Sequence, residues 1–262
     1  IVSCPEELGS GSGYASESRF YANYNQFGEK ITKGEFVDPK HISEVHYLDA
    51  RDKEGNILDR SRSVKEIINA NTDAAVVGSL VFGSKSGIKD DLDIIDPDDG
   101  TMWVVDLCQF RVDPKLIHEL LEKGVMIMLT GSKFFQAPPF CAAMLVPRKW
   151  SEELKQVEAS IIEPYGKLFS AYDVPWFMQN MREYLPEREN KALRLRWEIA
   201  LDEMEAYSYW SVEQTDDIIT RWAMGVMARV EDSVYFRLMP DQLKTNMSII
   251  SLQVWVNGSA LN

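Results

Sequence analysis

Short apolar runs, each bounded by helix or turn signals, constrain the fold of this chain most strongly. The run from Ala74 to Phe82 is nearly unbroken, and Met102 to Val105 and Val125 to Leu129 form two more. Apolar runs of this length without polar alternation are typical of strands that are covered on both faces, as in parallel sheets. Because helix signals stand between the runs, we expect an α/β layer.

Those helix signals are local and specific. Ser63 to Glu66 reads as a capping box, and Asp113 reads as an N-cap with Pro114 at the first helical position. The buried stripe of this second helix is predicted at Leu116, Ile117, Leu120 and Leu121. With a further strand expected over Val45 to Leu48, the pattern predicts a mostly parallel sheet with flanking helices.

Beyond Pro147 the composition shifts toward charged helices. Asn190 is expected to cap one helix, and Ser211 to Gln214 to open another. The buried face of the first is predicted at Leu193, Trp197, Ala200, Leu201 and Met204. Two strands are expected over Ser233 to Met239 and Ser248 to Val256. We therefore divide the chain into a partial large domain (1–150) and a stretch of connecting helices with part of a smaller α+β C-terminal domain (151–262).

Charge and composition exclude several classes of function. The 262 residues carry 28 Lys and Arg against 41 Asp and Glu, and a net charge of −13 repels a nucleic-acid backbone. The sequence contains no run of eighteen apolar residues, the length that a helix needs to cross a bilayer. Three cysteines without paired spacing and three histidines leave little for a zinc site, and Cys108 and Cys141 are expected in the core. A reduced, cytoplasmic location is predicted.

Polar groups follow two of the predicted strands. Asp106 and Gln109 come after one, and Thr130, Ser132 and Lys133 come after the other. In an open α/β sheet, ligands bind at the carboxyl ends of the strands. Pyridoxal phosphate (PLP) needs such a set: an amine to bind its aldehyde, a carboxylate to keep its ring nitrogen protonated, and hydroxyls for its phosphate.

At this point the sequence resembles a known family. Residues 106–109 (Asp-Leu-Cys-Gln) and 130–133 (Thr-Gly-Ser-Lys) are similar to the Asp-x-x-Gln and Ser-x-His-Lys motifs of cysteine desulfurases and class V aminotransferases. The likeness covers roughly residues 40–150, including the turn and strand after the lysine. Ser132 stands in place of the family's histidine, and Gln136 and Cys141-Ala142 stand where glycines are usual.

The resemblance implies a PLP-dependent transferase fold of type I and a role for each matching residue. Lys133 would carry PLP as a Schiff base, Asp106 would pair with the pyridine nitrogen, and Gln109 would bond the ring oxygen. Thr130 and Ser132 would hold the phosphate. The resemblance also implies a homodimer and a small amino substrate, with further cofactor-binding groups upstream of Ile1 in a longer protein.

Transamination is the reaction we predict, through exchange of an amino substrate at Lys133. Two alternatives stay open: a desulfurase or lyase reaction, and a PLP-fold interaction protein that has lost catalysis. A desulfurase would need a cysteine well beyond the lysine, and none follows Cys141. Cofactor absorbance would separate an enzyme from an inactive protein.

Three glycine-containing stretches allow other interpretations. Residues 78–86 superficially resemble a phosphate-binding P-loop, but the interior Leu80-Val81-Phe82 is strand-like. Residues 84–87 (Ser-Lys-Ser-Gly) fit either the family's turn near the ring oxygen or an ordinary turn. Residues 9–13 (Gly-Ser-Gly-Ser-Gly) fit either a flexible linker or a turn lining a site.

Overall fold

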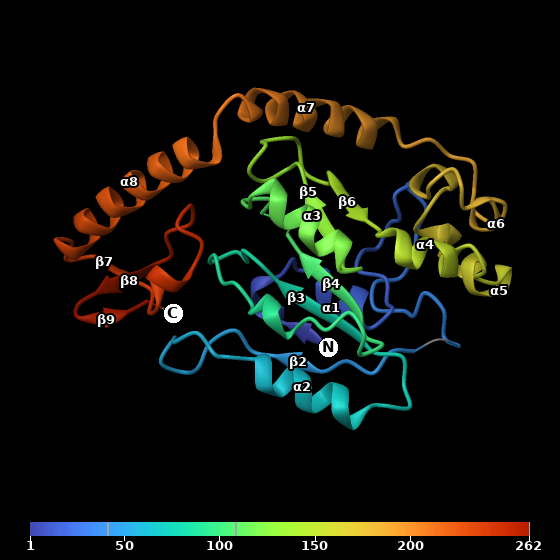
Figure 1. The fold of residues 1–262 in the computed structure, drawn as a ribbon, viewed down its shortest axis with the longest axis horizontal. Coiled ribbons are helices and arrows are strands. Elements are labelled where there is room, and N and C mark those ends of the chain that lie inside the picture. The colour runs from blue at the N-terminus through green and yellow to red at the C-terminus, as the bar shows by residue number, and fades with distance from the viewer. Residues whose placement is uncertain (41, 108, 262) are drawn as a thin grey trace.

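The structure is a computed structural model that describes residues 1–40, 42–107 and 109–261, so the core prediction for Cys108 falls outside it. A central sheet lies between α2 and α7, and α8 leads away from it to a second, small sheet (Figure 1). The strands are β1 (Val2–Ser3), β2 (Tyr47–Leu48), β3 (Val77–Val81), β4 (Met102–Asp106), β5 (Met126–Thr130), β6 (Ala142–Leu145), β7 (Phe236–Leu238), β8 (Leu252–Val256) and β9 (Ser259–Ala260). The α-helices are α1 (Ser12–Ser16), α2 (Ser61–Ala70), α3 (Pro114–Glu122), α4 (Arg148–Leu154), α5 (Ala159–Ile162), α6 (Gln179–Arg182), α7 (Lys191–Ser208) and α8 (Val212–Glu231).

The central sheet has the order β2-β1-β3-β4-β5-β6. Every neighbouring pair is parallel except β5 and β6, which run antiparallel. Asp106 at the end of β4 is the register partner of Val81 in β3 and of Met128 in β5. The predicted architecture, a mostly parallel sheet with flanking helices, is confirmed.

The two faces of the sheet are covered unequally. On one face, Trp103 and Val105 are buried in the main core together with Val64 of α2 and Leu120 of α3. The stripe predicted for α3 packs there, at Leu116, Ile117, Leu120 and Leu121. On the opposite face, Val104 and Met126 pack against Trp150 of α4. Val77 and Met144 leave 46% and 49% of their surface exposed.

The helix boundaries depend on caps that the sequence predicts with mixed success. The caps at Asp113, Asn190 and Ser211 are confirmed, since each side chain accepts a backbone N–H bond in the first turn of its helix. The capping box at Ser63 is wrong, because α2 already begins at Ser61. There the Asp59 carboxylate accepts a hydrogen bond from the Ser61 N–H at 3.0 Å.

Other expectations need correction as well. Residues 9–13 are no linker, because Ser12 begins α1 and the neighbouring turn packs against the ring of Tyr21. The strand expected over 74–82 is limited to β3, and those expected over 45–48, 233–239 and 248–256 shrink to β2, β7 and β8. Leu201 is exposed, whereas Ala200 on the same helix is fully buried. An exposed helix surface carries many apolar residues here, so apolar spacing alone misplaces the buried face.

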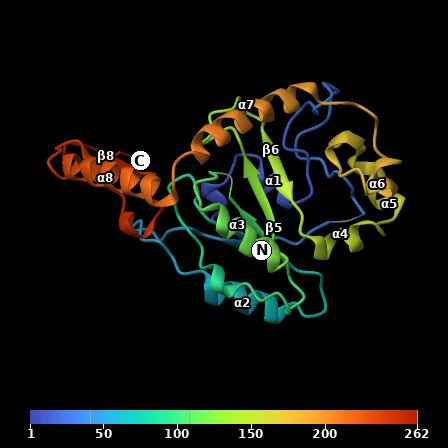
Figure 2. The ribbon, with the colours of Figure 1, turned by 45° about the horizontal axis from the view of Figure 1, so that its top comes forward.

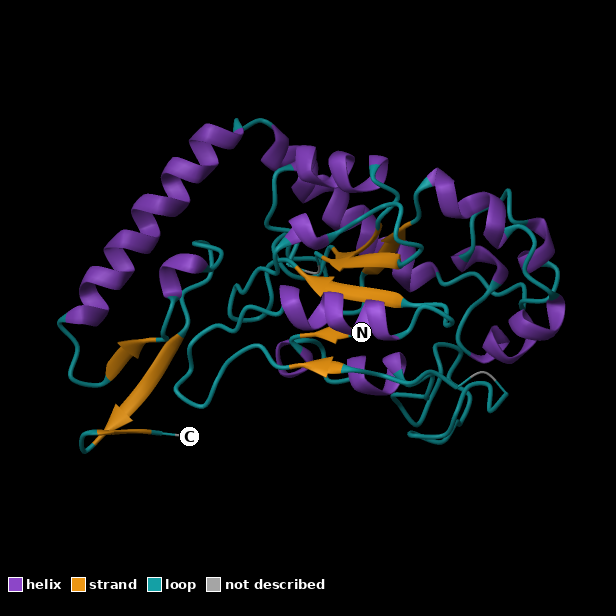
Figure 3. Ribbon diagram, turned by 60° about the horizontal axis from the view of Figure 1, so that its bottom comes forward, coloured by secondary structure: helices purple, strands orange, loops and turns teal. Residues whose placement is uncertain are grey.

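The C-terminal strands β7, β8 and β9 form a separate antiparallel sheet beyond the end of α8 (Figure 3). The segment between β7 and β8 returns to the edge of the central sheet. Asn246 donates its backbone N–H to the Gly87 carbonyl at 2.7 Å, and Arg51 donates to the Pro240 carbonyl at 3.0 Å. Within the described residues, no helix is both long and apolar enough to cross a membrane.

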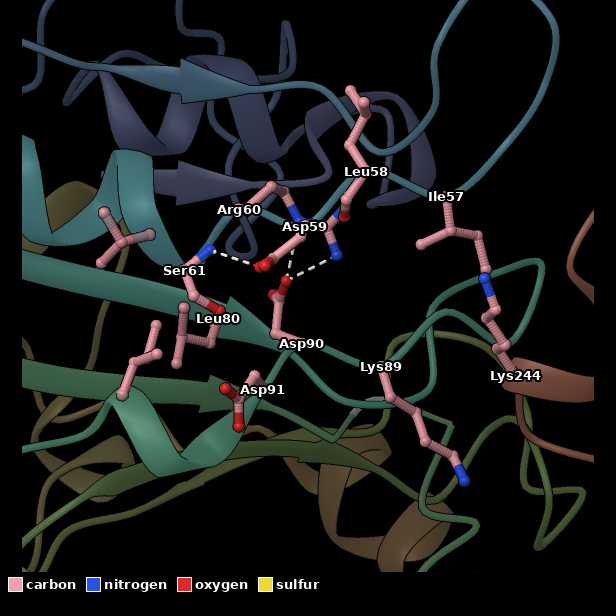
Figure 4. Close-up of a pocket in the computed structure, with 12 residues that line it drawn as sticks. Ile57, Leu58, Asp59, Arg60, Ser61, Leu80, Lys89, Asp90, Asp91 and Lys244 are labelled. Atoms are coloured by element: carbon pink, nitrogen blue, oxygen red, sulfur yellow. Dashed lines mark hydrogen bonds and ion pairs between the residues drawn. The ribbon is translucent and has the colours of Figure 1, made fainter.

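A buried ion pair joins the first strand, α2 and the segment after β3. The guanidinium of Arg60 lies 2.7 Å from the carboxylate of Asp90, and both side chains are almost fully buried (Figure 4). Asp90 also accepts hydrogen bonds from the Ser3 hydroxyl and the Val81 N–H. Nε of Arg60 donates to Asp90 and to the Ser3 hydroxyl, and Nη1 donates to the carbonyls of Ala50 and Leu58. Every charged oxygen and nitrogen of the pair is therefore satisfied.

We predict that Asp90→Ala destabilises the fold by about 3–5 kcal/mol, because it leaves the Arg60 charge buried without a counterion. Glu66→Ala is the matched control, since Glu66 pairs with Arg62 on the exposed surface of α2 and its loss should change stability little. Urea unfolding followed by circular dichroism measures both. Equal losses in the two variants would contradict the assignment.

Candidate functional site

Asp106 and Thr130 end neighbouring parallel strands and face the same side of the sheet. Residues two apart in a strand point to the same face of the sheet, so Asp106 lies on the face of Val104, and Thr130 lies on the face of Met128. Because Asp106 and Met128 are register partners, strand spacing and rise place the Cα atoms of Asp106 and Thr130 roughly 8 Å apart. Asp106 is half-buried and Thr130 is buried. The face they share is the one that α4 covers only in part.

Lys133 lies three residues beyond Thr130 in the turn that leads to β6. Its side chain is exposed, and among the described residues its ammonium makes no hydrogen bond or ion pair. An amine held at a sheet edge without a partner is available to a ligand. The lysine turn and Asp106 thus follow the carboxyl ends of two adjacent parallel strands.

The hydroxyl of Thr130 is used inside the turn. It donates to the Cys141 carbonyl, and its oxygen accepts from the Ser132 N–H at 3.2 Å. The Ser132 hydroxyl lies 2.8 Å from the Thr130 hydroxyl and, since Thr130 has given its proton to Cys141, Ser132 is the donor of this pair. The predicted phosphate contact from Thr130 would require its hydroxyl to turn away from Cys141. Ser132 needs only a rotation about its C–O bond.

Helix α7 packs directly on the lysine turn, a contact that the sequence did not predict. It runs across the sheet on the side of β5 and β6 (Figure 2). A Cβ atom placed on Gly131 would lie 2.4 Å from the Cβ of Ala200 in α7 and 3.1 Å from the sulfur of Cys141. Only glycine permits this approach. Cys141 is fully buried, which confirms the core prediction, and burial raises the pKa of its thiol.

Aromatic rings add to the contact between the turn and α7. Phe134 and Phe135 pack edge to face with each other and with Tyr207 of α7, at centroid distances of 5.1 to 5.8 Å. Phe110 packs on Phe135 at 5.1 Å. Gln136 adopts a φ of 56°, in the left-handed region that favours glycine. The turn therefore contains a strained, exposed residue next to a packed aromatic cluster.

Gln109 lies at the junction of three loops. A Cβ placed on Gly83 would lie 4.0 Å from the Cβ of Gln109 and 3.9 Å from the side-chain nitrogen of Asn246. Gly83 has a φ of 94°, which only glycine adopts without strain. The loop after β3, the loop after β4 and the segment before β8 thus meet beside Gln109.

The turn at residues 84–87 is held by a carboxylate. Glu7 accepts hydrogen bonds from the Ser84 hydroxyl and from both the hydroxyl and the N–H of Ser86. Burial raises the pKa of Glu7, but these hydrogen bonds outweigh it and hold the pKa below its ordinary value. No helix follows Gly87 directly, since the chain returns from Phe82 to pair with Lys89. The P-loop interpretation is therefore wrong.

Two hollows of the described surface lie away from the site residues. One of about 260 Å³ is lined by Arg60, Lys89 and Asp90 among others, and one of about 180 Å³ by Arg19, Phe36 and Tyr47 among others. None of the five predicted site residues lines either of them. The candidate site is thus an open edge of the sheet, defined by its residues.

Comparison with known proteins gives little beyond this geometry. No family model and no curated protein matches the chain. A comparison with solved structures finds the crystal structure of mouse CSAD, cysteine sulfinic acid decarboxylase, in its apo form. The identity is 14%, the TM-score is 0.49, and the match covers 80% of this chain and 43% of that one. The chain therefore spans less than half the length of this protein.

We predict that Gly131→Ala lowers stability by about 1–3 kcal/mol, because the added methyl group forces α7 away from the lysine turn. Gly225→Ala in α8 is the matched control. No atom lies within 4 Å of its added methyl group, and alanine favours a helix by about 1 kcal/mol over glycine. The midpoints of urea unfolding should move in opposite directions. A Gly131→Ala protein as stable as the unchanged one would refute the close approach.

Proposed function

We propose that this chain is part of a PLP-dependent enzyme of fold type I that acts on an amino acid or amine, with aminotransferase-like chemistry, and that Lys133 holds the cofactor. The observation that carries the proposal is the placement of Lys133 and Asp106. They leave adjacent parallel strands at one edge, with an unpartnered amine on one strand end and a half-buried carboxylate on the other.

The donor set fits the cofactor. When bound, PLP supplies an aldehyde that joins an amine and a cationic ring that withdraws electrons from the substrate carbon. The Asp106 carboxylate can hold a proton on a ring nitrogen, because partial burial strengthens its interaction with a cation. The Gln109 amide can donate to a ring oxygen, and Ser132 can turn its hydroxyl toward phosphate. The Lys133 amine can bind the aldehyde and later move the substrate's α-proton.

We further propose a homodimer, in a cytoplasmic location, acting on a small amino substrate. Apolar side chains near the site support a dimer, since Phe140 in the turn before β6 and Met144 in β6 are exposed. Exposed apolar residues continue along α7 and α8, among them Leu195, Ile199, Trp210, Trp222 and Met224. A second copy of the chain could cover this surface.

Reductive trapping tests the proposal. The full-length protein that contains this segment is incubated with PLP, reduced with borohydride and digested, and we expect the pyridoxyl group on the peptide that contains Lys133. Lys133→Arg should abolish the label, whereas Lys85→Arg, which changes an exposed lysine in the turn held by Glu7, should keep it. A label on Lys85, or no label with PLP in excess, would defeat the proposal.

The label separates an enzyme from an inactive protein, and analysis of the products separates the enzyme chemistries. A PLP-fold interaction protein without catalysis would leave Lys133 unlabelled. An enzyme with desulfurase or lyase chemistry would be labelled as well and would differ in its products.

A further inference from the structure

Arg111 follows the candidate site residue Gln109 by two positions, and its backbone is fixed. The chain turns at Phe110, whose φ of 51° is unusual for a bulky residue. The Phe110 N–H donates to the Leu107 carbonyl, and the Arg111 carbonyl accepts from the Asn246 side chain at 2.9 Å. Backbone strain of this kind persists only where the surroundings enforce it, and it is frequent at ligand sites.

The guanidinium of Arg111 contacts the lysine turn and the segment before β8. Its central carbon is 5.1 Å from the centroid of the Phe134 ring, and Phe134 directly follows Lys133. On the other side, one terminal nitrogen donates to the Ser248 carbonyl at 3.3 Å. Arg111 thus stands at the junction of the lysine turn with the C-terminal segment.

The charge of Arg111 is not neutralised within the described chain. Its Nε atom is buried without a hydrogen-bond partner, and no carboxylate of a described residue pairs with it. Burial lowers the pKa of the guanidinium, as expected for a cation withdrawn from water. The other buried arginines differ, since Arg60 is paired with Asp90, and Arg51 lies 3.8 Å from the Glu7 carboxylate.

We propose that Arg111 binds the oxyanion of a ligand held at Lys133, either the carboxylate of an amino substrate or the phosphate of the cofactor. This inference rests on the proposed function and adds a specificity residue to it. A planar guanidinium offers parallel N–H donors that match two oxygens of such a group. Partial burial makes that recognition stronger than at the exposed surface. Within the described chain the guanidinium contacts only the Phe134 ring and, through a long hydrogen bond, the Ser248 carbonyl, and neither carries a negative charge.

Paired ligands test the proposal on the full-length protein. In the first pair, absorbance titration compares PLP with pyridoxal, which lacks the phosphate. In the second, the PLP-loaded protein is titrated with glycine and with methylamine, which lacks the carboxylate. In Arg111→Gln we expect affinity for the member of one pair that carries the phosphate or carboxylate to fall roughly 10- to 100-fold, with the member that lacks this group unchanged. The affected pair identifies the source of the oxyanion.

Two further variants serve as controls. Arg111→Lys keeps the charge without the planar fork and should lose less affinity than Arg111→Gln, and it also serves if the latter folds poorly. Arg62→Gln removes the same charge from the exposed surface of α2 and should leave all four affinities unchanged. If Arg111→Gln weakens both members of each pair equally, or neither, the proposal is overturned. Absence of label on Lys133 in the unchanged protein would instead remove the proposed function itself, and this inference with it.

Discussion

The parallel register of β4 with β5 is the constraint on which the candidate site depends. Because Asp106 is paired with Met128, strands β4 and β5 end at the same edge of the sheet, and Thr130 faces the same side as Asp106. A shift of one residue would turn Thr130 to the opposite face, into the core formed with α2 and α3. The apolar side chains that fill that core, Trp103, Val105 and Ile127, hold the register by alternating with the site face.

Buried polar contacts then fix the loops around that edge. Asp90, paired with Arg60, holds the segment after β3, and Glu7 holds the turn at Ser84 and Ser86. Asn246 connects this turn to Arg111 through its backbone N–H and its side chain. Such contacts are costly to break one at a time, because the partner left behind stays buried. They give three loops from distant parts of the sequence one arrangement.

The sequence predicts most of what is local and little of what is long-range. The strands at 102–105 and 125–129 and the caps at Asp113 and Ser211 follow from apolar runs and capping chemistry, which act over a few residues. The capping box at Ser63 is wrong because the chain becomes helical two residues earlier, where Arg60 is the N-cap without a side-chain bond and Asp59 accepts the Ser61 N–H. The packing of Ala200 on Gly131 and the unpaired charge of Arg111 join segments far apart in sequence, and no spacing rule identifies them. In the sequence, only two small residues, Gly131 before Ser132 and Ala200 in the predicted buried face of α7, indicate that the helix could approach the turn closely.

The central claim is that Asp106 and Lys133 serve one cofactor, and the protonation of the pyridine nitrogen tests it most directly. Full-length protein loaded with ¹⁵N-enriched PLP can be followed by NMR across neutral pH, beside Asp106→Asn and the exposed control Asp113→Asn. The account predicts a protonated ring nitrogen in the unchanged protein and in Asp113→Asn, and an unprotonated one in Asp106→Asn, because a neutral amide does not stabilise the cationic ring. The same protonation in all three proteins would contradict it.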